Sequence, residues 1–310
     1  MIIVFGSINV DLVMRVAHLP DPGETVIGGD YFLVQGGKGA NQALAAARAA
    51  GLDNRVAMVG RTGPDDWAAF ATAILADEGI DLSSVLTGEK PTGCATICVD
   101  DKGENAIAVA SGANMEVAAE QVPEAWLTPE SWLVLQMEVP LSENWRLIER
   151  ARAHGTKILL NVAPAAPVPE TALDAVDILV VNEHEARTVA EALGIHGDGF
   201  EDVGRALAER HGLACITTLG SEGVLAITPE QAWRGGVLPV TPVDTTGAGD
   251  AFVGTLAATL QSGASLPQAL RRASVTAGLS CAKAGAQSSF PSAAEIESRL
   301  ADLPEPGPAT

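Results

Sequence analysis

The feature that most constrains the fold of this 310-residue chain is a regular alternation of short apolar runs with helix-like segments. The runs have the length and the β-branched content of buried strands. Because most are separated by a segment long enough for a helix, they predict an α/β fold: a mostly parallel central sheet with helices on both faces. The runs span residues 2–5, 55–59, 132–136, 157–161, 178–181 and 214–218.

Two stretches interrupt this alternation, at about residues 10–34 and 93–110. They lack helical periodicity and contain turn sequences at 20–23 and 100–103. Together they predict a small antiparallel sheet that projects from the main domain as a lid or a subunit contact. Two separate hairpins are the alternative that fits the same sequence pattern. We therefore expect a single domain over 1–310 with these insertions, and a mobile Pro-rich tail at 303–310.

The charge balance limits the partners. With 39 acidic and 19 basic residues the formal net charge is −20, which disfavours nucleic acid and anionic membranes. No apolar run approaches the 18 residues of a membrane span, and residues 1–5 indicate a first strand and not a signal peptide. Four scattered cysteines favour a reducing cytoplasm, with Cys94 and Cys98 more typical of core packing than of a metal site.

A glycine-rich junction at 244–250, Asp-Thr-Thr-Gly-Ala-Gly-Asp, opens an expected helix. Backbone amides at such a junction can hold phosphate, because glycine admits close approach and the first helical turn has unpaired donors. A carboxylate at the same place, Asp250, can accept a proton from an attacking hydroxyl, so the combination favours phosphoryl transfer. Taken alone, the junction would also fit a capped helix after a tight turn.

A second set of polar residues suits a neutral polyol. Gly-Gly-Lys-Gly-Ala-Asn at 36–41 opens another helix, Asn9 and Asp11 follow the first strand, and Glu138 follows a later one. Ordinary turn and loop chemistry is the alternative for each alone. Residues 36–41 do not form a Walker A loop, because Phe32 replaces its first glycine and Gly39 follows the lysine. The 247–249 turn likewise lacks the third glycine of the dinucleotide fingerprint, where Phe252 stands.

In this order and spacing, Gly-Ser-Ile-Asn-Val-Asp at 6–11 and the motifs at 36–41 and 244–250 resemble the ribokinase-like carbohydrate kinases. The resemblance covers nearly the whole chain, since further matching motifs lie at 161–165, 181–185, 218–223 and 285–287. It implies that Asp250 is the base, that the amides of Gly247, Ala248 and Gly249 form an anion hole, and that the following residues hold ribose: Asn9, Asp11, Gly37, Lys38, Asn41, Glu138 and Asp250.

The same resemblance implies a nucleotide site and two kinds of cation. Asn182 and Glu185 would organise Mg²⁺ and phosphate, although helix capping also explains this pair. The ATP site would be lined by these residues: Thr218, Leu219, Gly220, Ser221, Glu222, Gly223, Gly249 and Ser274. A hairpin turn is the alternative interpretation of residues 218–223. A monovalent cation would be held by Asp244, Thr246, Ser280, Lys283, Gly285 and Ser289. Potassium is the expected cation, because most of the oxygen ligands would be neutral.

The resemblance thus implies an ATP-dependent sugar kinase that converts D-ribose to ribose 5-phosphate by direct in-line transfer, and a homodimer joined through the lid. A nucleoside kinase or another neutral-sugar kinase of the same fold is the alternative. A non-catalytic sensor and an oxidoreductase are more remote. Asp250 argues against the sensor, since binding alone needs no base, and the absent dinucleotide fingerprint argues against the oxidoreductase.

Overall fold

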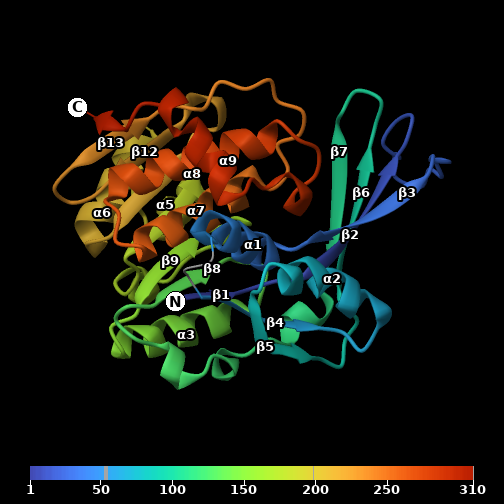
Figure 1. Ribbon diagram of the computed structural model, residues 1–310, viewed down its shortest axis with the longest axis horizontal. Coiled ribbons are helices and arrows are strands. Elements are labelled where there is room, and N and C mark those ends of the chain that lie inside the picture. The colour runs from blue at the N-terminus through green and yellow to red at the C-terminus, as the bar shows by residue number, and fades with distance from the viewer. Residues whose placement is uncertain (52–54, 198, 310) are drawn as a thin grey trace.

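The computed structural model describes residues 1–51, 55–197 and 199–309. Its large sheet has ten strands in the order β14-β13-β12-β11-β10-β9-β8-β1-β4-β5 (Figure 1). All neighbours from β11 to β5 are parallel, and β12, β13 and β14 add antiparallel pairs at the other edge. The strands are β1 (Ile2–Phe5), β4 (Val56–Thr62), β5 (Asp81–Thr87), β8 (Trp132–Leu135), β9 (Lys157–Asn161), β10 (Ile178–Asn182), β11 (Ala214–Thr218), β12 (Val224–Ile227), β13 (Ala232–Gly235) and β14 (Gly307–Pro308).

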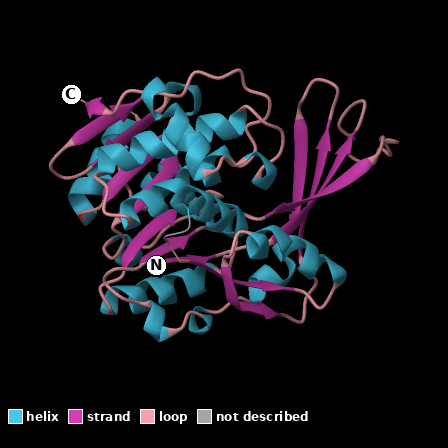
Figure 2. Cartoon of the chain, viewed as in Figure 1, coloured by secondary structure: helices cyan, strands magenta, loops and turns pink. Residues whose placement is uncertain are grey.

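Helices cover both faces of this sheet, as Figure 2 shows, which confirms the predicted fold class. The central strand β1 explains why: Ile2 and Val4 face one hydrophobic cluster, while Ile3 and Phe5 face the other. One face carries α1 (Lys38–Ala50), α2 (Asp66–Asp77), α7 (Ala248–Gln261), α8 (Leu266–Cys281) and α9 (Ala293–Arg299); the other carries α3 (Leu141–Ala153), α4 (Glu170–Leu173), α5 (Glu183–Ala192) and α6 (Phe200–His211).

A second, four-stranded sheet projects from the domain beside α2 (Figure 1). This sheet, called the lid below, has the order β3-β2-β6-β7. Its strands are β2 (Asn9–Arg15), β3 (Tyr31–Gly36), β6 (Gly93–Val99) and β7 (Asn105–Ala110). The prediction of an antiparallel lid was wrong for its central pair, because β2 and β6 are parallel. Both strands continue from strands that are parallel in the large sheet, β1 and β5, so they leave it in the same direction.

Two details differ from the sequence predictions. The predicted apolar runs included neither β5 nor the antiparallel edge strands β12, β13 and β14. Part of the expected tail is attached to the domain: Leu303 is buried, Pro308 pairs with Trp233, and Thr310 lies outside the described residues. Within the part of the chain that the structure describes, no helix combines the length and apolar content needed to cross a membrane.

Candidate active site

Helix α7 begins at the glycine-rich junction. Gly247 is the N-cap and adopts a left-handed conformation with φ of 76°. A Cβ at this position would also lie 2.9 Å from the Ala286 side chain, so both the backbone and the packing require glycine. A Cβ at Gly249, in contrast, would meet no atom within 4 Å. The space beside Gly249 in the first turn of α7 is therefore open, as an anion cradle requires, while the Ala248 amide donates to the Thr245 carbonyl at 3.2 Å.

Asp250 stands in this first turn and is buried, with 6% exposure. Its Oδ2 accepts a hydrogen bond from Asn41 Nδ2, and its Oδ1 accepts one from Gln42 Nε2, each at 2.9 Å. Both donors lie on α1, which packs against α7 so closely that a Cβ on Gly254 would be 2.3 Å from the Gln42 carbonyl oxygen. The two amides hold the carboxylate in one orientation next to the amide cradle.

A group of polar residues predicted to bind sugar surrounds the start of α1. Glu138 Oε2 accepts from Ser7 Oγ at 2.5 Å and from the Lys38 amide at 3.0 Å. Asn9 and Asp11 lie two residues apart on β2, and Asn9 Oδ1 accepts from Asn114 Nδ2 at 2.7 Å. The chain reaches α1 through Gly37, the N-cap with φ of 88°, where a Cβ would lie 2.8 Å from the Asn9 nitrogen.

The electrostatics tie these residues together. The pKa of Lys38 is raised mainly by the negative charge of Asp250, against the lowering effect of burial, with further support from Glu138, Glu185 and Asp11. Burial raises the pKa of Asp11 to about 7, and the charges of Glu138 and Asp250 add to this shift while Lys38 opposes it. Four carboxylates thus share the field of one ammonium group, and Asp11 changes charge near neutral pH.

A cavity of about 440 Å³ adjoins the first turn of α7. Its lining is largely apolar and comes from the β11–β12 turn, from α7 and α8, and from the segment 236–242. Of the predicted nucleotide residues, Thr218, Gly220, Ser221, Gly223, Gly249 and Ser274 line it. Leu219 is instead buried in a hydrophobic cluster, and the exposed Glu222 lies 3.7 Å from Arg234. Residues 218–223 are also the hairpin turn that the alternative interpretation expected.

Asn182 and Glu185 form a reciprocal capping box at the start of α5. Asn182 Oδ1 accepts from the Glu185 amide at 2.8 Å, and Glu185 Oε2 accepts from the Asn182 amide at 2.7 Å. The capping interpretation therefore describes this pair. Glu185 nevertheless belongs to the electrostatic cluster: burial raises its pKa, hydrogen bonding and Lys38 oppose the shift, and Asp250 adds to it.

The six residues predicted to hold a monovalent cation are only partly brought together. Asp244 accepts from the Thr246 hydroxyl at 2.6 Å, the Thr246 amide at 2.9 Å and the Gly285 amide at 2.8 Å. Burial raises the pKa of Asp244, but these hydrogen bonds outweigh it and lower the pKa. The other side chains bond elsewhere: Ser280 to the Ala277 carbonyl, Ser289 to the Ala286 carbonyl and Lys283 to Glu295.

For these two cations the donor set fits to different degrees. The described residues contain no cluster of three or more His, Cys, Asp or Glu side chains arranged to hold a metal. Mg²⁺ usually keeps several waters and binds through substrate phosphates and one or two carboxylates, a requirement that the single carboxylate of Glu185 can meet. A potassium site at Asp244 would need backbone carbonyls beside the single carboxylate, since the hydroxyls of Ser280 and Ser289 already donate to carbonyls.

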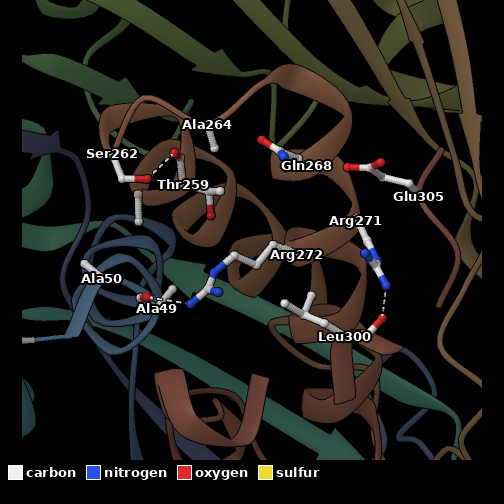
Figure 3. Close-up of a pocket in the computed structure, with 11 residues that line it drawn as sticks. Ala49, Ala50, Thr259, Ser262, Ala264, Gln268, Arg271, Arg272, Leu300 and Glu305 are labelled. Atoms are coloured by element: carbon white, nitrogen blue, oxygen red, sulfur yellow. Dashed lines mark hydrogen bonds between the residues drawn. The ribbon is translucent and has the colours of Figure 1, made fainter. Parts of the chain in front are cut away.

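A second cavity, of about 470 Å³, lies at the opposite end of α7 (Figure 3). Arg271 and Arg272 line it, but their guanidinium groups are engaged by the protein. Arg271 donates to the carbonyls of Leu300 and Leu303, and Arg272 donates to the Ala49 carbonyl and to Glu297. These bonds attach the C-terminal segment to α8, and α8 to α1. The two arginines beside this cavity therefore have a structural role.

The structure adds three side chains that the sequence analysis did not single out. Ser7 bonds Glu138, Gln42 bonds Asp250, and Asn114 bonds Asn9. A signal was present for Gln42, because it is a polar residue inside an alanine-rich helix and directly follows Asn41. The sequence gives no such signal for Asn114, because its contact with Asn9 spans 105 residues and depends on the folding of the lid.

The arrangement defines a class of protein. An anion cradle, a buried carboxylate, a polar cluster on one side and a largely apolar cavity on the other make a site for phosphoryl transfer to a small hydroxylated molecule. The model of the pfkB family of carbohydrate kinases matches residues 1–293. The chain belongs to this family, and it is a phosphotransferase that acts on a sugar hydroxyl.

Individual relatives agree. The ribokinase of Lactococcus lactis subsp. lactis is 35% identical over 305 residues, which is 97% of each chain. Among solved structures, the ribokinase of Thermotoga maritima has a TM-score of 0.89 at 31% identity and covers 97% of this chain and 99% of its own. The ribokinase of Arabidopsis thaliana, complexed with ribose and ATP, has a TM-score of 0.86 at 30% identity, with 96% and 98% covered.

The raised pKa of Asp11 predicts a pH-dependent stability. A carboxyl whose pKa is higher in the folded than in the unfolded protein stabilises the fold at low pH, and this stability is lost as pH rises toward about 7. Replacing Asp11 by Asn removes that loss. The variant should therefore gain about 4 kcal/mol in unfolding free energy over wild type between pH 4 and pH 8, measured by chemical denaturation without ligands.

The control is Asp101→Asn, an exposed residue at the turn between β6 and β7. It should follow wild type at every pH. If Asp11→Asn and wild type lose stability in parallel as pH rises, Asp11 does not titrate as described.

Proposed function

We propose that this chain is an ATP-dependent kinase that phosphorylates D-ribose to ribose 5-phosphate. The observation that carries the proposal is the position of Asp250: a buried carboxylate in the first turn of α7, beside both an amide cradle and a polar cluster suited to a neutral sugar. The similarity to ribokinases over nearly the whole chain supports ribose as the acceptor. The Arabidopsis complex supports ATP as the donor.

In this mechanism Asp250 accepts the proton of the ribose hydroxyl as its oxygen attacks the γ-phosphorus of ATP in line. The amides of Gly247, Ala248 and Gly249 stabilise the negative charge on the transferred group. Asn9, Asp11, Gly37, Lys38, Asn41 and Glu138 hold the sugar in orientation. Lys38 also reduces the repulsion between the incoming phosphates and the carboxylates of the site.

The nucleotide would occupy the 440 Å³ cavity, with its base against the apolar wall and its phosphates toward Gly249. Mg²⁺ would bind between the ATP phosphates and the Asn182–Glu185 region, where it supplies neutralisation of phosphate charge. Asp244 and neighbouring carbonyls would hold a potassium ion beside the cradle. Four free cysteines and the use of ATP support a cytoplasmic location.

The lid supports a homodimer. Its edge strands β3 and β7 carry exposed apolar side chains, among them Tyr31 and Phe32 on one strand and Ile107 and Val109 on the other. Ile107 and Val109 are two residues apart and share one face of β7. An exposed edge strand with apolar side chains is a surface that proteins usually cover, and a second copy of the lid offers the matching surface.

The first test is a coupled ADP-release assay across ribose, deoxyribose, fructose, arabinose and nucleosides, with and without K⁺. ADP should form in proportion to added ribose, and K⁺ should raise the rate. Turnover with nucleosides but no pentose would favour the nucleoside-kinase alternative. Binding of sugar without any ADP formation would favour the sensor.

The second test addresses the base. Asp250→Ala should lower kcat by about 10²- to 10⁴-fold, because a positioned base contributes that much to proton transfer. The matched control is Asp77→Ala at the end of α2, away from the site, which should leave kcat near wild type. Turnover of Asp250→Ala within a few-fold of wild type would refute its role.

The third test concerns assembly. Light scattering should give the mass of a dimer for the wild-type protein, and Ile107→Asp should shift it toward the monomer because it places a charge on the apolar edge. Gly247 and the rest of the cradle are untouched by this change. A strictly monomeric, active wild-type enzyme would contradict the proposal.

A further inference from the structure

Gln42 is the side chain on which the orientation of Asp250 depends, although it is itself fully buried. Its Nε2 donates to Asp250 Oδ1 at 2.9 Å and to Asn161 Oδ1 at 3.1 Å. Its Oε1 accepts from Gln136 Nε2 at 2.7 Å. Every polar atom of the Gln42 amide is therefore used, and a reversal of the amide would break all three bonds.

The orientation of this amide follows from a main-chain group. Asn161 Nδ2 donates to the Val180 carbonyl oxygen at 3.1 Å, and a carbonyl oxygen can only accept. Asn161 must then present its Oδ1 to Gln42, and Gln42 must present its nitrogen to Asn161. The same nitrogen faces Asp250, so a chain of amides anchored at the Val180 carbonyl in the middle of β10 determines which atom the carboxylate meets.

The other oxygen of Asp250 is held in a similar way. Asn41 Nδ2 donates to it, and Asn41 Oδ1 accepts from Gln287 Nε2 at 2.9 Å. Both neighbours of the carboxylate are amide nitrogens, which donate hydrogen bonds and have no free lone pair to accept a proton. Neither can take a proton from Asp250, and together they hold both carboxylate oxygens in place.

We propose that Gln42 is a positioning residue for phosphoryl transfer: it holds the Asp250 carboxylate in a single plane facing the acceptor hydroxyl. Gln42 acts through Asp250 and not on the substrates, because it is buried between α1 and α7 with no exposed surface. The close approach of α7 at Gly254, one turn after Asp250, keeps the two side chains in register. The inference rests on the proposed role of Asp250 as the proton acceptor.

The test is Gln42→Met, which keeps most of the volume and removes every polar atom of the amide. A hydrogen bond to a charged group is lost, so kcat should fall about 10- to 100-fold. The KM values for ribose and ATP should change by less than about threefold, because no substrate contact is altered. The matched control is Thr255→Val, a buried α7 residue whose Oγ1 has no partner among the described atoms, and its kcat should stay near wild type.

A double-mutant cycle with Asp250→Ala separates positioning from a general structural effect. If Gln42 acts through Asp250, then Gln42→Met lowers kcat in the wild-type background and leaves the residual kcat of Asp250→Ala unchanged. Equal losses in the two backgrounds would overturn the proposal. So would a wild-type kcat in Gln42→Met.

Gln136→Met is the second variant for testing the positioning role if Gln42→Met does not fold. It removes the bond to Gln42 Oε1 and leaves the contact between Gln42 and Asp250 in place, so kcat should fall by about 3- to 10-fold. An unchanged kcat in this variant would also count against the proposal. An active Asp250→Ala would refute the base, whereas an inactive Asp250→Ala with a normal Gln42→Met would refute only the positioning role.

Discussion

The contact between α1 and α7 is the constraint on which the rest of the site depends. The two helices come from opposite ends of the chain and begin at the same edge of the large sheet, each after a glycine with positive φ. Gly254 lets them approach so closely that side chains of α1 reach the first turn of α7. One helix start presents the polar groups suited to a sugar, and the other presents the amides suited to a phosphate. Their packing sets the distance between the two substrates.

Burial gives this contact its chemical character. Away from water, a carboxylate needs hydrogen-bond donors, and the structure supplies Asp250 with two buried amides. Asp11 has a different environment, in which burial and the neighbouring negative charges act together and raise its pKa to about 7. The cluster thus contains one carboxyl with a raised pKa, Asp11, and one carboxylate held by two amide donors, Asp250.

Much of the fold could be predicted from the sequence, because each buried parallel strand is a short apolar run that needs no knowledge of its neighbours. All six predicted runs became strands of the large sheet. Strand β5 was missed because it is half exposed and lacks such a run, and the direction of β6 beside β2 depends on where β1 and β5 lie in the sheet. The glycine motifs indicated both helix starts, since glycine there is required by backbone conformation.

The site residues that depend on distant packing were harder to predict. The link from Gln136 through Gln42 to Asn161 joins three elements, and no spacing in the sequence records it. The expected cation site shows the reverse difficulty: the motif residues are present, but the structure directs the Lys283 side chain to Glu295. Side-chain direction follows from the local helix end and from charged neighbours, which a motif alone does not specify.

The parallel pairing inside the lid has a geometric consequence for the sugar. Asn9 pairs with Gly36 on one side and with Gly93 on the other, so it stands at the root of the lid, where three strands enter it together. A rotation of the lid about this root would displace its tip much further than Asn9 and Asp11. Such a rotation would therefore change the access of solvent to the site while the groups suited to sugar recognition stay near their positions.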